Sequence, residues 1–339
     1  MLPALEDVST REGLPDIATK LAEIRRWLHN DLTDMESALQ EASGSNDLAE
    51  RSASHLLASP GKRIRPLCVM LAARTGTSPN PIAVRDLAVA CELVHTATLL
   101  HDDVIDEGTE RRGQPTARLV YGNTASVLGG DHLLVEALKR VQSAGKPELL
   151  TSMLDVISSM VRAEAIQLAH RGDFQPDRER YFTVVNGKTA SLFHWAMDAG
   201  AQIAGATEEQ RRALAEAGRL LGVAFQLIDD TLDLTGSSEI LGKDLCVDLR
   251  EGKLTWPLIV ACEADPDLQK AIADVVRSPN SQGLQFLLKR IVATGCIELT
   301  REKARGVARE ADEHLDSLPP SPVRDALKAV VQSAISRAK

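Results

Sequence analysis

The stretch from Leu93 to Thr116 constrains this chain most, because it ends an apolar run with three closely spaced aspartates. Asp102, Asp103 and Asp106 follow the run LVHTATLLH and precede two adjacent arginines. If the run is helical, residues three and four positions apart share a face, so Asp102 and Asp106 lie together with Asp103 beside them. Hard divalent cations such as Mg²⁺ bind carboxylate clusters of this kind, commonly with substrate phosphates as further ligands. The stretch therefore predicts a helix with a metal and phosphate site at its end.

A second aspartate cluster repeats this spacing far along the chain. The segment QLIDDTLDLTG places Asp229, Asp230 and Asp233 at the end of another apolar helical pattern. A single acidic helix end is commonly no more than a solvated surface feature. Two clusters with the same spacing, each ending an apolar helix, instead favour two metal-binding walls that face each other across a diphosphate.

Five motifs together resemble those of the trans-isoprenyl diphosphate synthases. In chain order they are GKRIRP at 61–66, HDDVIDEGTERRG at 101–113, GKT at 187–189, QLIDD at 226–230 and DLREGK at 248–253. Each motif is weak alone, but their order and spacing make the combination specific. The resemblance implies an all-α fold, a single isoprenoid-synthase-type helical bundle around a central active-site cavity. It also implies several Mg²⁺ ions per active site and usually a homodimer.

The reaction implied by this resemblance has three parts. An allylic diphosphate loses its diphosphate and leaves a resonance-stabilised carbocation, the double bond of isopentenyl diphosphate attacks that cation, and a proton then leaves. No side-chain nucleophile is needed, so such a protein has to stabilise the leaving group and fix the geometry of the reactants. We therefore expect a Mg²⁺-dependent, chain-elongating trans-prenyltransferase.

The resemblance also assigns roles at the first diphosphate, residue by residue. The implied metal ligands are Asp102, Asp103, Asp106, Asp229, Asp230 and Asp233, with Asp233 ranked lowest. Around the allylic diphosphate it implies Arg111, Lys188, Thr189, Gln226, Lys243 and Lys253. Lys188 and the five higher-ranked aspartates form the expected catalytic set.

Isopentenyl diphosphate needs a cationic site of its own, because it must be held without ionising. Lys62 and Arg65 stand at the start of a helix, where free N–H groups and the helix dipole favour anions. The resemblance adds His95 and Arg112 as ligands of the same diphosphate. A lone histidine on an apolar helix is usually a core residue, but His95 lies two helical turns before Asp102 and on its face.

Small side chains near the first cluster predict a long product. Ala97 and Thr98 lie one turn before Asp102, where short-chain members of the family carry an aromatic plug. Leu138 stands where some long-chain relatives have a phenylalanine floor. We therefore expect a polyprenyl product of octaprenyl to decaprenyl class, and we expect Ala97→Phe to shorten it.

Local departures from the family pattern leave a shorter product open. Phe193, His194 and Trp195 put bulky rings where small residues are frequent, and any of them could close the cavity from a neighbouring helix. A geranylgeranyl diphosphate synthase whose floor is set by Trp195 is the alternative. Gln114 replaces a common lysine, and Cys246 begins an unusual stretch, which bears on specificity and loop closure rather than on the basic chemistry.

Three more distant functions are weighed against the same residues. A terpene cyclase of the same fold would not need the isopentenyl site. A head-to-head synthase lacks the GKxxRP start. A non-catalytic partner subunit of a synthase would be expected to have lost aspartates or basic ligands, and all of them are present here.

Composition indicates the expected partners and cellular compartment of the protein. A formal net charge of −9 argues against nucleic acid as a partner, which would call for a basic patch. Five scattered cysteines without a CxxC pair are typical of a reducing compartment. The N-terminus lacks a signal pattern, and no uncharged apolar run approaches the ~20 residues that span a bilayer. We expect a cytoplasmic protein with no transmembrane segment and at most a peripheral membrane contact for product release.

Apolar periodicity predicts helices along nearly the whole chain. The expected ranges are about 16–42, 48–58, 65 onward, 82–106, 124–143, 149–170, 178–200, 208–234, 256–263, 267–277, 284–294, 296–317 and 322–337. Aromatic residues are only 3% of the chain, so Leu, Ala, Val and Ile must form the core between closely packed helices. No linker divides the chain, and we expect one domain over 1–339, with residues 1–15 loosely ordered.

Overall fold

The fold is all-α, as predicted. The computed structural model describes residues 15–44, 46–59, 61–77, 79–235, 246–277 and 281–336. The elements are α2 Pro15–Trp27, α3 His29–Ser43, α4 Leu48–Leu57, α5 Ile64–Ala72, η1 Ala73–Thr75, α6 Pro81–Ile105, β1 Glu110–Arg111, β2 Gln114–Pro115, α7 Ala117–Tyr121, α8 Asn123–Ser143, α9 Pro147–Ala169, α10 Arg178–Val185, η2 Asn186–Ala190, α11 Ser191–Ile203, α12 Glu208–Thr235, α13 Val247–Arg250, α14 Trp256–Ala264, α15 Asp267–Arg277, α16 Ser281–Ala293, α17 Cys296–Asp316 and α18 Pro322–Ile335.

Two long helices, α6 and α12, carry the two aspartate clusters at their C-terminal ends. The start of α6 follows from its sequence. The side chain of Asn80 accepts hydrogen bonds from the N–H groups of Ile82 and Ala83, at 3.1 and 3.4 Å, and Pro81 occupies the first turn. Most of α6 is apolar and buried on several faces, which is expected of a helix inside a bundle rather than on its surface.

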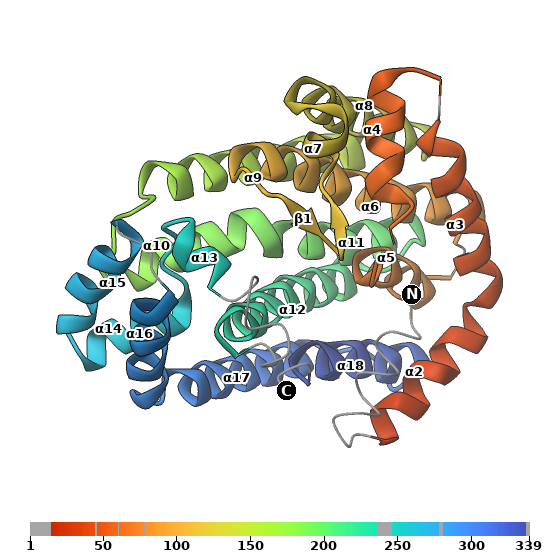
Figure 1. Ribbon diagram of the computed structural model, residues 1–339. Coiled ribbons are helices and arrows are strands. Elements are labelled where there is room, and N and C mark those ends of the chain that lie inside the picture. The colour runs from red at the N-terminus through yellow and green to blue at the C-terminus, as the bar shows by residue number, and fades with distance from the viewer. Residues whose placement is uncertain are drawn as a thin grey trace.

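The bundle is layered around these two helices (Figure 1). Helix α6 packs on α8, and α12 packs on α17, which runs along the lower edge in Figure 1 together with α18. Helix α11 contacts α5, α6, α9 and α12, so it ties the two cluster-bearing helices together. Asp102 near the end of α6 and Asp229 near the end of α12 line one cavity, so these two helix ends face the same space.

Two predicted helices are interrupted in the structure. The range 16–42 is divided at Leu28 into α2 and α3. The range 178–200 is divided by η2, a π-helical turn that carries the GKT motif. At Gly187 in this turn, a Cβ would lie 2.7 Å from the Cβ of Ala163 on α9, so only glycine allows this close approach of the two helices.

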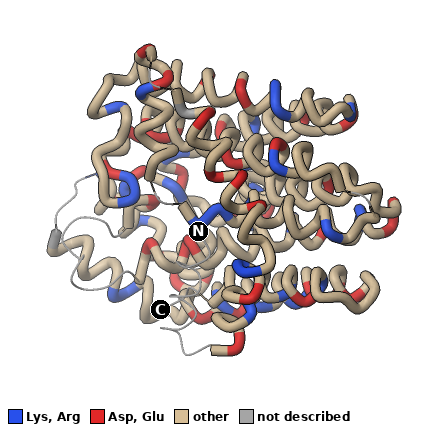
Figure 2. Tube along the Cα trace, turned by 90° about the vertical axis from the view of Figure 1, so that its right-hand side faces the viewer, with Lys and Arg blue, Asp and Glu red and all other residues tan. Residues whose placement is uncertain are grey.

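The core consists of one large cluster and one smaller one. The large cluster is built mainly of Leu, Ala, Val, Ile and Met, as the composition predicted, and extends from α2 to α18. The smaller cluster lies among α13 to α17 and includes Leu258, Leu268 and Ile291. Acidic and basic residues are interspersed along the trace in Figure 2 rather than divided between two faces. None of the helices in the described ranges is both long and apolar enough to cross a membrane.

Candidate active site

Three cavities meet beside the end of α6. The acidic cavity, of about 570 Å³, is lined by the first aspartate cluster and by Asp248 and Lys253. The cationic cavity, of about 450 Å³, is lined by the basic residues of the GKRIRP motif and by Arg111. The apolar cavity, of about 200 Å³, lies between α6, α8 and α9. Asp102 and Lys188 line all three, so these two side chains mark the point where the cavities join.

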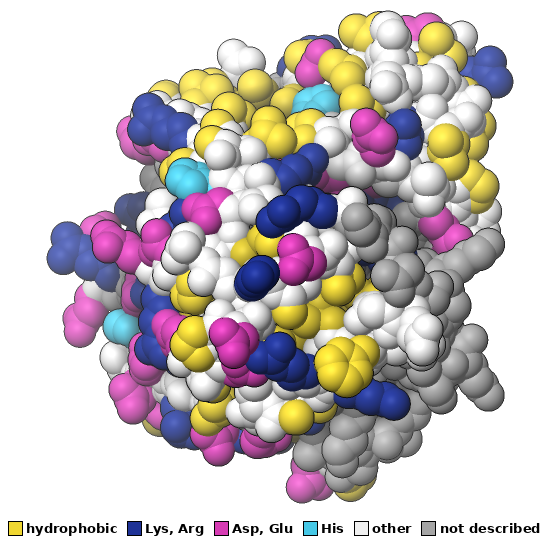
Figure 3. Space-filling view, turned by 60° about the vertical axis from the view of Figure 1, so that its left-hand side comes forward, with side chains coloured by type: hydrophobic (Ala, Val, Ile, Leu, Met, Phe, Trp, Pro, Cys, Tyr) yellow, Lys and Arg dark blue, Asp and Glu magenta, His cyan; other side chains and the backbone are white. Residues whose placement is uncertain are grey.

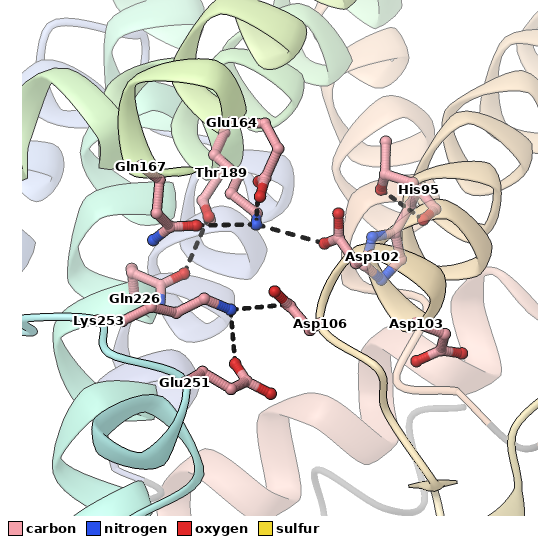
Figure 4. Close-up of polar contacts among 12 residues, drawn as sticks. His95, Asp102, Asp103, Asp106, Glu164, Gln167, Thr189, Gln226, Glu251 and Lys253 are labelled. Carbon is pink, nitrogen blue, oxygen red and sulfur yellow. Dashed lines mark hydrogen bonds and ion pairs between the residues drawn. The ribbon is translucent and has the colours of Figure 1, made fainter. Parts of the chain in front are cut away.

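Two lysines pair with aspartates of the first cluster (Figure 4). The Nζ of Lys188 lies 3.4 Å from Oδ2 of Asp102. The Nζ of Lys253 donates to Oδ2 of Asp106 at 2.7 Å, and Arg171 pairs with the other oxygen of Asp106. Burial would raise the pKa of Asp106, but Lys253 and the other nearby cations outweigh it and hold that pKa below its usual value. At Asp102 burial prevails over Lys188 and raises the pKa.

Asp103 points in a different direction from its neighbours. Its side chain is 1% exposed, and its Oδ1 accepts a 2.7 Å hydrogen bond from Nε of Arg111. Burial raises the pKa of Asp103, with Arg111 acting in the opposite sense. Its Oδ2 is buried and has no hydrogen-bond partner in the described part of the chain. Asp103 thus joins α6 to the short β1–β2 hairpin while keeping one buried oxygen available to a further cation.

The second cluster is divided between two environments. Asp230 is fully buried and accepts hydrogen bonds from the hydroxyl of Tyr181 at 2.6 Å, from Gln226 at 2.9 Å and from the N–H of Trp256 at 3.3 Å. Burial, then the charge of Asp248, raises the pKa of Asp230 to about 8. Three donors therefore already surround this carboxyl group, whereas Asp229 lines the cationic cavity.

Asp233 contacts the start of α13. Its Oδ1 accepts a 2.9 Å hydrogen bond from the N–H of Val247, and its own carbonyl accepts one from the N–H of Cys246 at 2.9 Å. Burial and the charge of Asp248 raise the pKa of Asp233 to about 7. These contacts connect α12 to the segment that follows it.

The π-helical turn η2 directs Lys188 and Thr189 toward the cavities. Lys188 pairs with Glu164 and donates to Oε1 of Gln167 at 3.1 Å (Figure 4). The hydroxyl of Thr189 donates to Oε1 of Gln226 at 2.9 Å. These contacts link η2 to α9 through Lys188 and to α12 through Thr189. Lys243 lies outside the described residues.

The predicted isopentenyl residues converge on the cationic cavity, which Lys62, Arg65, His95 and Arg112 all line. The guanidinium of Arg65 lies over the ring of Phe193, 4.4 Å from its centroid, a favourable cation–π arrangement. Burial, followed by the charges of Arg65 and Arg112, lowers the pKa of His95 well below its usual value. His95 is therefore neutral and keeps one N–H for donation to an anion.

Several residues of these cavities were missed by the sequence reasoning. They are Glu92 on α6, Glu164 and Gln167 on α9, Tyr181 on α10, and Asp248 and Glu251 near α13. The spacing of Glu164 and Gln167, one helical turn apart, would have placed both on one face of α9. Asp248 and Glu251 stand inside the DLREGK motif, and their acidity was the available signal.

The predicted chain-length residues are only partly on a cavity wall. Thr98 lines both the cationic and the apolar cavity. Ala97 is fully buried in the core and Leu138 packs against it, and neither lines any of the three cavities. The residues on the apolar wall are instead Val94, Ile105, Leu134, Ile157, Met160, Val161, Ala165 and Leu168.

The three bulky residues after the GKT motif point away from the apolar cavity. Phe193 lies under Arg65, Trp195 donates to Oγ of Ser152 at 3.0 Å, and His194 is exposed. None of them lines the apolar cavity. The floor at Trp195 that the shorter-product alternative requires is therefore not observed.

The donor set fits a metal that shares its ligands with a substrate. No three His, Cys, Asp or Glu side chains of the described residues converge as a ready-made metal site. Mg²⁺ usually binds one or two carboxylates together with substrate phosphates rather than an all-protein cage. The carboxylates of Asp102 and Asp106 and the unpartnered oxygen of Asp103 match that requirement.

Residues 46–291 match the polyprenyl synthetase family. The octaprenyl diphosphate synthase of Escherichia coli is 37% identical over 94% of this chain and 99% of the relative. The nonaprenyl diphosphate synthase of Mycobacterium tuberculosis is 33% identical over 89% and 90% of the two chains. The crystal structure of a polyprenyl synthase from Caulobacter crescentus complexed with calcium and isoprenyl diphosphate is similar, with a TM-score of 0.88, 33% identity and coverage of 93% and 97%.

The environment of His95 predicts a pH dependence of stability. In the unfolded chain His95 binds a proton as the pH falls below about 6.5, whereas the folded protein keeps it neutral. The stability contributed by this group is therefore present above that pH and is lost as the pH falls, by up to about 1.4 kcal/mol per pH unit. Urea unfolding at pH 7.5 and 5.5 should show a smaller acid loss in His95→Gln than in the wild type. Equal losses would show that His95 is not held neutral.

Proposed function

The chain belongs to the polyprenyl synthetase family and is a prenyltransferase of the long-chain polyprenyl diphosphate synthase type, and we propose that it condenses isopentenyl diphosphate with an allylic prenyl diphosphate in a Mg²⁺-dependent reaction. The product we propose is of octaprenyl to decaprenyl class. One observation carries the proposal: two chemically different polar cavities and an apolar one join at Asp102 and Lys188. Such an arrangement suits two diphosphates and one prenyl chain.

In this proposal the allylic diphosphate occupies the acidic cavity. Asp102, Asp103 and Asp106 would hold Mg²⁺ from one wall and Asp229 and Asp230 from the other, with Asp233 ranked lowest because it lines neither polar cavity. Mg²⁺, when bound, acts as a Lewis acid on the diphosphate oxygens.

Cationic side chains around the same cavity would bind the departing diphosphate directly. Lys188, Lys253 and Arg111 line the acidic cavity. Each is paired with a carboxylate in the absence of substrate, which keeps it at the site. Thr189 and Gln226 would orient the reactants, and Lys243 remains part of the proposed set by resemblance.

The cationic cavity would hold isopentenyl diphosphate with its C–O bond intact. Lys62, Arg65 and Arg112 offer fixed positive charges, and neutral His95 offers a hydrogen bond. The growing chain would enter the apolar cavity, whose walls include Thr98 and Met160. Met160 and Thr98 also line the cationic cavity, so they lie where the new bond would form.

A homodimer is part of the proposal, and the outer faces of α8 and α9 are the surface that favours it. These two helices pack on each other. Large exposed hydrophobic residues on them are Val127, Leu128 and Val135 on α8 and Leu154, Val161 and Leu168 on α9. In Figure 3, hydrophobic side chains gather over the upper part of the molecule, at the level of α7 to α9 in Figure 1. We propose that a second copy of the chain covers this face.

The proposed setting is the cytoplasm, with a peripheral membrane contact for release of the product. All five cysteines are free and buried, which supports a reducing compartment. Val161 and Leu168 line the apolar cavity and are also exposed, at 63% and 49%. In the single chain the apolar cavity therefore reaches the outer face of α9, which the proposed second copy would cover.

Removal of the metal or of either carboxylate wall tests the function. Asp102→Asn and Asp229→Asn should each lower kcat by about 10²–10³-fold, because each removes a carboxylate that would hold the Mg²⁺ acting on the leaving diphosphate. Incorporation of labelled isopentenyl diphosphate should also stop in excess chelator and return with added Mg²⁺. Circular dichroism should show that both variants keep the helical fold. Near-normal turnover in chelator, or in either variant, would contradict the two-wall arrangement.

Leu134 and Leu138 are two candidate positions for the floor of the apolar cavity. Leu134 lines the apolar cavity, whereas Leu138, one turn further along α8, does not. Leu134→Phe should therefore shorten the product by one or more isoprene units, because it fills part of a cavity of about 200 Å³. Leu138→Phe is the matched control and should leave the chain length unchanged. Chromatographic sizing of the products measures the chain length. Shortening by Leu138→Phe but not by Leu134→Phe would support Leu138 as the floor position, as expected from the sequence.

Introducing a single charged side chain tests whether the proposed dimer face is an interface. Val135 on α8 is 51% exposed, and Leu299 on α17 is 48% exposed and lies on another helix. Val135→Glu should shift the protein toward monomer in sedimentation velocity at micromolar concentration, because it places a charge in an apolar contact. Leu299→Glu should sediment as the wild type does. A wild-type monomer, or an unchanged Val135→Glu dimer, would remove α8 from the interface.

A further inference from the structure

A buried carboxylate lies at the basic end of the cationic cavity. Glu92 is on α6, is 2% exposed and lines this cavity together with the basic residues of the GKRIRP motif. It is separate from the two aspartate clusters, which line the same cavity through Asp102 and Asp229. A carboxylate at this place needs an explanation, because it would repel a diphosphate bound nearby.

The direct partner of Glu92 is Arg63. One guanidinium nitrogen of Arg63 pairs with Glu92, and another donates to the carbonyl of Leu57 at 3.0 Å. Arg63 is itself buried, and its backbone is left-handed, with φ 48° and ψ 34°, immediately before α5. A residue with a Cβ adopts this conformation at a cost and keeps it only where surrounding contacts impose it. The ion pair with Glu92 is such a contact.

The conformation of Arg63 sets the directions of its neighbours. Arg63 turns into the protein toward Glu92, whereas Lys62 is exposed and Arg65, the second residue of α5, lines the cavity over Phe193. The buried pair therefore lies at the residue between the two predicted diphosphate ligands of this motif.

Glu92 also offsets repulsion among the arginines. A Cβ placed on Gly61 would lie 3.1 Å from a guanidinium nitrogen of Arg63 and 3.1 Å from one of Arg112, so these two cations approach the same point. Desolvation lowers the pKa of Arg112, and the charge of Glu92 is the largest influence in the opposite direction. Removing Glu92 would leave several guanidinium groups crowded together without a buried anion between them.

We propose that Glu92 is a positioning residue for the isopentenyl diphosphate site: through Arg63 and through its charge, it holds Arg65 and Arg112 in place before the diphosphate binds. The proposal rests on the proposed function of the cationic cavity. Preorganised cations lose less conformational entropy on binding. We therefore expect Glu92 to affect the affinity for isopentenyl diphosphate and not that for the allylic substrate.

A purely structural ion pair is the alternative, and the same helix supplies a matched control. Asp86 on α6 is 8% exposed and accepts hydrogen bonds from Arg85 at 2.9 Å and from Arg140 at 3.2 Å. It lines none of the three cavities. Asp86→Asn and Glu92→Gln therefore each neutralise a buried, arginine-paired acid of α6, and only Glu92→Gln does so beside the cationic cavity.

The experiment measures steady-state kinetics with each substrate varied in turn. Glu92→Gln should raise the KM for isopentenyl diphosphate by at least about tenfold, equivalent to about 1.4 kcal/mol of binding. Its KM for the allylic diphosphate and its kcat should stay within about twofold of the wild type. Asp86→Asn should change neither KM, although it lowers the stability. Glu92→Asp, which keeps the charge, should recover most of the affinity and serves as the test if Glu92→Gln does not fold.

The outcomes separate this inference from the function on which it rests. If the wild type does not consume isopentenyl diphosphate at all, the proposed function fails. If the wild type is active and folded Glu92→Gln has an unchanged KM for isopentenyl diphosphate, only the role of Glu92 is overturned. The same holds if both KM values rise equally, if kcat alone falls, or if Glu92→Asp is as impaired as Glu92→Gln.

Discussion

The pairing of lysines with aspartates at the end of α6 is the interaction on which the site depends. Two unit charges 4 Å apart interact by about 4 kcal/mol at an effective dielectric constant of 20, so unpaired carboxylates could not be packed this closely inside a bundle. Lys188 and Lys253 approach Asp102 and Asp106 from two other parts of the chain. The π-helical turn η2 and the segment after α13 are the elements that bring them there. The fold therefore positions these two lysines beside the aspartates of α6.

Much of this arrangement could be predicted, because it follows from periodicity and short motifs. The apolar pattern with a period of 3.6 residues located α6 and α12, and the aspartate spacing placed a cluster at the end of each. The directions of individual carboxylates could not be predicted. Asp230 is enclosed by Tyr181 and Trp256, which come from distant segments, so only the tertiary packing reveals that its oxygens already have donors.

The wall of the apolar cavity could likewise be predicted only in part from the sequence. Counting back from Asp102 identified Ala97 and Thr98 as candidates, but adjacent helical positions point in different directions, and only Thr98 faces the cavity. Ala97 is enclosed by the core, where a phenylalanine would overpack its surroundings rather than block a chain. Much of the wall comes from α9, through Ile157, Met160 and Val161. No motif marked these residues, because an apolar residue on a cavity wall and one in the core look alike in a sequence.

The different chemistry of the two polar cavities explains how one diphosphate could leave while the other stays. Arginine keeps its charge at any physiological pH and forms hydrogen bonds of fixed geometry, and His95 is neutral beside it. Such a site stabilises a bound diphosphate equally before and during the reaction, so it contributes to affinity and not to cleavage. The acidic cavity instead combines carboxylates with lysines that can exchange partners, so its contacts can strengthen as negative charge develops on a departing group. In the proposed reaction, the residues that decide which C–O bond breaks would be those around Lys188, where the two cavities meet.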